Sequence, residues 1–124
     1  TERVIDAHVA ANLKCRVLAE GANGPTTPDA DLVLEKRQDE IFLIPDILCN
    51  SGGVIVSYFE WVQDIASFFW SEDEVNERLD HIIRDAFIAI WDLARDKGVS
   101  LRTATFIVGC TRILEAMELR GLYP

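Results

Sequence analysis

A strand–loop–helix–strand pattern near the amino end is the feature that most constrains the fold. Residues 15–20 and 41–44 are short apolar runs, which are ended by Gly21 and Pro45. Between them, the Thr-Pro pair at residues 27–28 is typical of a helix start, with threonine as the cap and proline in the first turn. Two short apolar runs that flank a helix indicate a βαβ unit with buried, parallel strands.

Ligands of parallel sheets bind beyond the carboxyl ends of the strands. Loops 21–27 and 45–53 follow the two predicted strands, so we expect both loops at the same edge of the sheet. The second loop ends in two glycines, residues 52–53, ahead of a helix predicted over residues 54–67; without a Cβ, this backbone allows another molecule to approach closely. Ser57 lies one turn into that helix and is the best candidate for a ligand contact, although an ordinary helical serine that bonds its own backbone is the alternative.

Helices are predicted for most of the remaining chain. A short helix is expected within residues 3–13, and a capping box of Ser71 and Glu74 opens a long amphipathic helix that ends at Gly98. Ser100 caps a last helix, which is apolar on more than one face and is therefore predicted to be buried on more than one side. Two parallel strands do not bury both faces alone, so we expect their partners in further chain or in other subunits.

Charge and composition argue against two classes of partner. The 124 residues include 12 Lys and Arg against 21 Asp and Glu, a net charge of −9, which opposes binding to nucleic acid. No apolar run approaches the roughly 18 residues of a membrane span, so no membrane partner is expected. The three cysteines are odd in number and lack the spacing of metal ligands, which predicts reduced thiols, no metal site and a cytoplasmic protein.

Several segments, in order along the whole chain, resemble glutamate dehydrogenases of the small hexameric type, within the glutamate/leucine/phenylalanine/valine dehydrogenase family. The segments are EGANGPTTPDAD at residues 20–31, IPDIL at 44–48, GGV at 52–54, VSYFEW at 56–61, WSE at 70–72 and RG at 120–121. The resemblance implies an α/β fold: residues 1–53 are the distal part of a Rossmann-like nucleotide domain, with its last parallel strands. Residues 54–124 are then carboxyl-terminal helices, which pack on that domain and back toward a substrate domain outside this chain.

The resemblance also implies a cofactor site for NAD or NADP. Asn23 and Asn50 resemble the asparagines that contact the nicotinamide end of the cofactor, and Gly21 and Ala22 shape the same loop. Without the resemblance, Asn23 is equally well explained as a turn residue beside glycine.

For the substrate, Ser57 resembles the serine that hydrogen-bonds the side-chain carboxylate, and Val54 the residue that packs beside the substrate. The implied reaction is the reversible oxidative deamination of L-glutamate to 2-oxoglutarate and ammonia in a homohexamer. The family's catalytic residues lie upstream of the segments matched here. No catalytic residue is therefore expected in this chain, and the chain alone is expected to be inactive.

Two alternatives stay open at this point. The first alternative to a glutamate dehydrogenase is a non-catalytic helical interaction or regulatory module that keeps the same fold. The second is a dehydrogenase for a different amino acid. A Gly-rich strand–turn–helix and a lysine-bearing substrate domain in upstream sequence would favour the enzyme.

Overall fold

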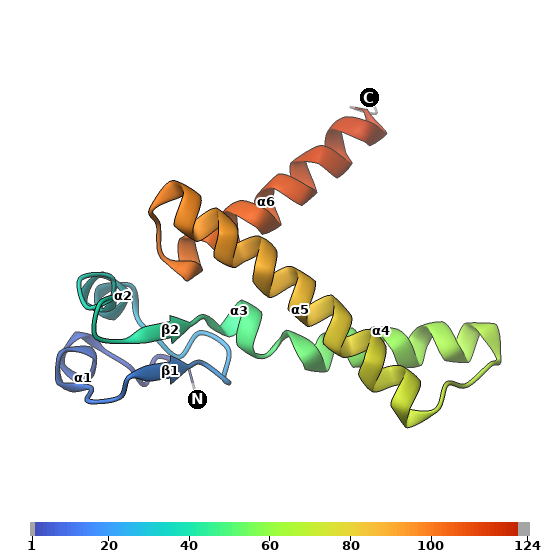
Figure 1. Ribbon diagram of the computed structural model, residues 1–124, viewed down its shortest axis with the longest axis horizontal. Coiled ribbons are helices and arrows are strands. Elements are labelled where there is room, and N and C mark those ends of the chain that lie inside the picture. The colour runs from blue at the N-terminus through green and yellow to red at the C-terminus, as the bar shows by residue number, and fades with distance from the viewer. Residues whose placement is uncertain (1, 122–124) are drawn as a thin grey trace.

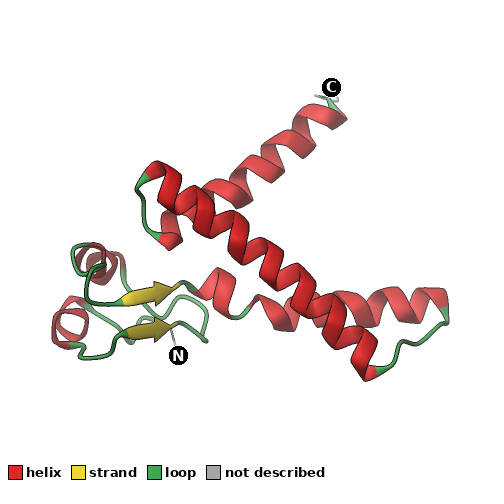
Figure 2. Cartoon of the chain, in the orientation of Figure 1, coloured by secondary structure: helices red, strands yellow, loops and turns green. Residues whose placement is uncertain are grey.

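The computed structural model describes residues 2–121; residue 1 and residues 122–124, which belong to the two predicted domain segments, lie outside the described residues. The elements follow in the order α1 (Ala7–Asn12), β1 (Val17–Ala19), α2 (Pro28–Glu35), β2 (Phe42–Ile44), α3 (Asp46–Cys49), α4 (Ser51–Ala66), α5 (Glu72–Lys97) and α6 (Leu101–Arg120) (Figures 1 and 2). The predicted α/β class, with parallel strands followed by long helices, is confirmed.

The two strands pair in parallel, with Val17 opposite Phe42 and Ala19 opposite Ile44. Successive side chains of a strand point to opposite faces. Accordingly, Leu43 packs against a cluster built by α1 and α2, while Phe42 and Ile44 pack against a cluster built by α3, α5 and α6. The βαβ unit therefore has helices on both faces of β2.

The first strand is less buried than the sequence indicates. Val17 is 56% exposed, because the cluster of α3, α5 and α6 includes side chains of β2 but none of β1. The prediction of a strand at residues 17–19 is confirmed, while the prediction that it is buried is wrong for this chain.

The amino-terminal segment forms a shorter helix than predicted. Asp6 caps α1 by accepting a hydrogen bond from the Val9 amide at 2.8 Å. Before this cap the chain is extended along the loop that follows β1: Ile5 N donates to Pro25 O and Thr27 N donates to Ile5 O, both at 2.9 Å. Residues 3–5 therefore support that loop and do not start the helix.

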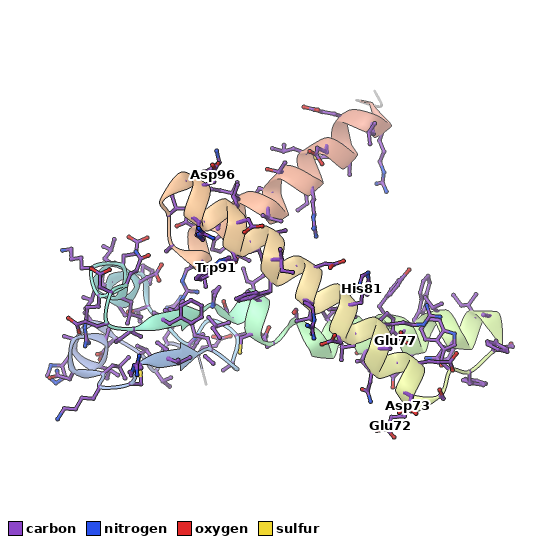
Figure 3. The ribbon with its side chains drawn as sticks, viewed as in Figure 1. Glu72, Asp73, Glu77, His81, Trp91 and Asp96 are labelled. Carbon is purple, nitrogen blue, oxygen red and sulfur yellow. The ribbon has the colours of Figure 1, made fainter. Side chains whose placement is uncertain are left out.

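A pair of antiparallel helices, α4 and α5, lies side by side, and α6 crosses the far end of α5 (Figure 1). Trp91, on the side of α5 toward the strands in Figure 3, packs edge-on against Phe42 of β2 with 5.7 Å between ring centroids. This contact joins the helices to the sheet.

The last helix projects from the body of the chain in its carboxyl-terminal half (Figure 1). Leu101 and Ala104 of its first turns are buried, whereas residues 109–121 are exposed. The prediction that this helix is buried on more than one side is wrong for this chain, because no described element packs against its second half. Within residues 2–121, none of the helices has both the length and the apolar character needed to cross a membrane.

The predicted capping box opens α5. The Ser71 hydroxyl accepts from Glu74 N at 3.3 Å, and Glu74 Oε2 accepts from Ser71 N at 2.8 Å. The hydrogen bond from the Ser71 amide, followed by that from its hydroxyl, lowers the pKa of Glu74. A lowered carboxyl pKa favours folding above the unfolded value of about 4.3, and this contribution is lost as the pH falls through the lower folded value.

We therefore expect Glu74→Gln to flatten the dependence of the unfolding temperature on pH below about pH 4.5. Thermal unfolding at several pH values, monitored by the circular dichroism signal of the helices, measures this slope. Glu77→Gln is the control, because Glu77 is an exposed glutamate of the same helix (Figure 3) that lies three positions beyond Glu74 and outside the capping box. Equal slopes for the Glu74→Gln variant and the parent protein would show that the capping carboxylate does not contribute.

Candidate functional site

The two loops that follow the strands meet at one edge of the sheet, as the βαβ pattern predicts. Glu20 N, directly after β1, donates to Ile44 O at 3.1 Å. Gly24 N, in the first loop, donates to Asp46 Oδ2 at 2.8 Å, at the start of α3. Gly24 has a φ of +54°, a value that glycine adopts without strain, and it bends the first loop toward the second.

A pair of asparagines joins the two loops. Asn50 Nδ2 donates to Asn23 Oδ1 at 2.6 Å and lies 3.5 Å from the carbonyl oxygen of Gly21. A shallow hollow opens beside this pair, and its lining residues are Asn23, Asp46, Ile47, Asn50, Ser51 and Val54. Three of the residues predicted from the sequence are thus brought together at one site.

The other loop residues contribute backbone. Gly21 presents its carbonyl oxygen to Asn50, and Ala22 connects it to Asn23. No protein atom lies within 4 Å of the position that a Cβ of Gly21 would occupy, so the space over this glycine is open. The polar residues that line the hollow are Asn23, Asp46, Asn50 and Ser51, which can orient a polar ligand, and its lining includes no lysine or histidine.

The second loop is more helical than predicted. A short helix, α3, occupies Asp46–Cys49, and α4 begins at Ser51, before the expected start at Val54. The glycines at residues 52–53 therefore lie inside a helix. A Cβ on Gly52 would meet Ile83 Cδ1 of α5 at 3.5 Å, whereas the space at Gly53 is open. The space for a close approach of a ligand is thus open at Gly53, whereas a Cβ at Gly52 would be in ordinary van der Waals contact with α5.

Val54 and Ser57 both lie on the exposed face of α4. Val54 is 70% exposed and borders the hollow, while Ser57 lies about one turn further along the helix and does not line it. The Ser57 hydroxyl donates to Gly53 O at 3.1 Å, as an ordinary helical serine does. Its oxygen still has acceptor capacity, and the hydroxyl can rotate toward another partner.

A network of charged side chains lies behind the two loops, and the sequence reasoning missed it. Arg102, in the first turn of α6, donates through Nη2 to Glu20 Oε1 at 2.6 Å and through Nε to Asp31 Oδ1 at 2.8 Å. A longer contact of 3.4 Å joins Arg102 Nη1 to Asp46 Oδ1. The Glu20 side chain is fully buried and that of Arg102 is 15% exposed.

Burial alone would lower the pKa of Arg102, but the hydrogen bonds from its guanidinium to Glu20 and Asp31 outweigh burial and raise the pKa. The arginine is therefore charged at every accessible pH. Its partners lie 82 and 71 positions away in the sequence, so no local pattern reveals them. The one local signal is a cation in the first turn of a helix, where the helix dipole disfavours it.

Metal binding has no support among residues 2–121, since they contain no group of three or more His, Cys, Asp or Glu side chains arranged to hold an ion.

Comparison with known proteins places this geometry in a family. The model of the glutamate/leucine/phenylalanine/valine dehydrogenase family matches residues 1–121. The chain is 49% identical over 124 residues to the NADP-specific glutamate dehydrogenase A1 of Halobacterium salinarum and 44% identical over 122 residues to the NAD-specific glutamate dehydrogenase of Clostridioides difficile. These matches cover 99% and 98% of this chain but only 29% and 28% of those proteins.

The structural comparison agrees. The hetero-hexameric glutamate dehydrogenase of Thermus thermophilus, solved in a leucine-bound form, superposes with a TM-score of 0.90 at 35% identity. The match covers 99% of this chain and 29% of that chain. The chain thus spans less than a third of the length of the relatives that it matches.

Proposed function

Because the chain belongs to the glutamate/leucine/phenylalanine/valine dehydrogenase family, we propose that the protein that carries it is a glutamate dehydrogenase. The reaction is the reversible oxidative deamination of L-glutamate to 2-oxoglutarate and ammonia, with hydride transfer to NAD or NADP. The observation that carries the proposal is the Asn23–Asn50 pair at the carboxyl edge of two parallel strands, where nucleotide cofactors bind in such sheets. Relatives specific for NAD and relatives specific for NADP support both cofactors.

The exposed apolar face of α4 supports a role for residues 54–124 in packing against further protein. Val54, Tyr58, Trp61 and Ile65 recur at helical spacing on this face, and each is more than half exposed. Contiguous apolar surface of this kind marks an interface. We propose that this face, with the hollow beside the Asn23–Asn50 pair, closes against a substrate domain outside the chain, in a homohexamer. The hetero-hexameric Thermus relative supports six subunits as the size of the assembly. The three free cysteines support a cytoplasmic location.

The direct test is the glutamate-dependent reduction of NAD and of NADP by the complete protein, followed by nicotinamide absorbance. We expect turnover with at least one of the two cofactors and none with the 124-residue chain alone. A complete protein without turnover toward glutamate but with turnover toward leucine, phenylalanine or valine would show a dehydrogenase for another amino acid. Inactivity toward all four would favour the non-catalytic alternative.

Replacement of Asn50 by alanine is expected to weaken cofactor binding. The substitution removes the Nδ2 donor and leaves Asn23 without its partner, which costs about 1–3 kcal/mol, or about 5- to 150-fold in the cofactor dissociation constant. Quenching of tryptophan fluorescence by the reduced cofactor measures this constant. Asn12→Ala is the control, because Asn12 donates only to His8 O at the end of α1. An unchanged constant for Asn50→Ala would contradict the cofactor role of the pair.

Replacement of Ser57 by alanine tests the substrate role. If the hydroxyl turns from Gly53 O to the side-chain carboxylate of glutamate, its loss raises the Michaelis constant for glutamate by about 5- to 150-fold, equivalent to about 1–3 kcal/mol. The Michaelis constant for the cofactor should stay unchanged. Thr105→Val is the control, since the Thr105 hydroxyl makes the same bond within a helix, to Leu101 O at 2.7 Å, away from the hollow. An equal effect of both substitutions would leave Ser57 with a structural role only.

A further inference from the structure

The buried network around Arg102 reaches the backbone of both loops. Glu20, besides binding Arg102, accepts a hydrogen bond from Asp46 N at 3.0 Å and one from the Thr26 hydroxyl. Asp46, besides its contact with Arg102, accepts one from Gly24 N. Residues 24 and 26 of the first loop and the start of α3 are therefore held by Glu20 or Asp46, two carboxylates that face one guanidinium.

Both asparagines of the hollow lie close in the sequence to residues that these hydrogen bonds hold. Asn23 lies between Glu20 and Gly24, both of which are held. Asn50 follows Asp46 by one helical turn, and its amide donates to Asp46 O at 2.9 Å. A displacement of either carboxylate would thus move one asparagine relative to the other and lengthen the 2.6 Å bond between them.

Local stability does not explain an arginine at this position. A cation in the first turn of α6 opposes the helix dipole, and the neighbouring Ser100 already caps that helix by accepting from Thr103 N. Burial of an arginine with three carboxylates also costs desolvation that a well-packed apolar group would avoid. The planar guanidinium fixes the positions of three carboxylates relative to one another, because its separate N–H groups contact Glu20, Asp31 and Asp46 at once.

We propose that Arg102 is a positioning residue for the cofactor site: by bridging Glu20 and Asp46 it sets the spacing of the loops that carry Asn23 and Asn50. The inference rests on the proposed function for its choice of ligand, the nicotinamide cofactor, and on the structure alone for its effect on the loops. It ties the geometry of that site to α6, which otherwise lies outside it.

The test uses Arg102→Met and Arg102→Lys in the complete protein. Lysine keeps the charge but has a single ammonium, which does not reproduce the three-way contact. The matched control is Arg37→Met: the Arg37 side chain is 20% exposed and donates to the carbonyl oxygens of Ala10 and Leu13, remote from both loops. Two readouts are compared, hydrogen exchange of the backbone over residues 20–26 and 46–50, and the dissociation constant of the reduced cofactor.

For both Arg102 variants we expect faster exchange in the two loop segments and cofactor binding weakened on the order of 10-fold or more. The Michaelis constant for glutamate should change far less, and Arg37→Met should change neither readout. Parent-like exchange of the loops in both Arg102 variants would overturn the inference whether or not the protein is a dehydrogenase. Faster exchange with unchanged cofactor binding would overturn the link to the cofactor.

The outcomes separate the inference from the function on which it rests. A parent protein that binds no nicotinamide cofactor and has no glutamate-dependent turnover refutes the proposed function. A parent protein that is active, with Arg102 variants that match Arg37→Met in cofactor binding, refutes the positioning role alone.

Discussion

Glu20→Gln is expected to lower the free energy of unfolding of the complete protein by about 3–5 kcal/mol, the cost of removing one partner from a buried ion pair. Every group that contacts the Glu20 carboxylate is a donor: the Arg102 guanidinium, the Asp46 amide and the Thr26 hydroxyl. A glutamine retains one acceptor but places an NH₂ donor against donors, and it leaves the charge of Arg102 less compensated. Volume and packing barely change, so the loss reports electrostatics and hydrogen bonding.

Urea unfolding measures this loss as a shift of the midpoint at constant slope. Glu40→Gln is the control, because Glu40 also pairs with an arginine, Arg37, at 2.7 Å but is 65% exposed. An exposed pair contributes about 0–1 kcal/mol, so the control should shift the midpoint little. Equal shifts for the two substitutions would mean that the Glu20 network is no more important than a surface ion pair.

Local patterns predicted the elements whose causes are local. The Ser71–Glu74 box, the Thr27 cap and the left-handed Gly98 that ends α5 act within one helical turn, and each forms as expected. The parallel pairing of the strands follows from the chain order of strand, helix and strand. The same order placed the two loops at one edge, which brought Asn23 and Asn50 together.

Burial was predicted less well, because it depends on partners that are not adjacent in the sequence. The apolar residues of β1 and of the second half of α6 have the composition of buried elements, yet they are exposed where no described segment covers them. The prediction of where α4 begins was wrong for a different reason. Glycine is unfavourable in the interior of a helix, but residues 52–53 lie in the first turn of α4, which begins at Ser51.

The residues of the candidate site also differ in whether the sequence indicated them. The resemblance to known dehydrogenases indicated three residues that line the hollow, Asn23, Asn50 and Val54, whereas Arg102 and its carboxylate partners emerged only from the fold. Long-range pairs of charges leave no periodic signal, since the residues between them contribute nothing to the contact. Half of the residues that line the hollow were thus accessible from the sequence, and the charged network behind the loops was not.

Trp61→Asp is expected to reduce self-association of the chain alone and to reduce the stability of the complete protein. In the 124-residue chain Trp61 is 58% exposed on the apolar face of α4, and its ring packs against Tyr58 with 5.8 Å between ring centroids. An aspartate there should reduce self-association of the chain, because it interrupts the contiguous apolar surface, without loss of helix. Sedimentation velocity of the chain measures the change in association.

In the complete protein the same substitution is expected to destabilise by at least the roughly 3–5 kcal/mol of a buried tryptophan truncation, because the proposed substrate domain would cover the face and a buried, unpaired carboxylate would add to the cost. Urea unfolding measures this loss, with Leu32→Asp as the control. Leu32, on α2, is 60% exposed and lies away from the α4 face, so this variant should stay within about 0.5 kcal/mol of the parent. If Trp61→Asp is equally neutral in the complete protein, the α4 face is open to solvent there, and the proposed closure against a substrate domain is wrong.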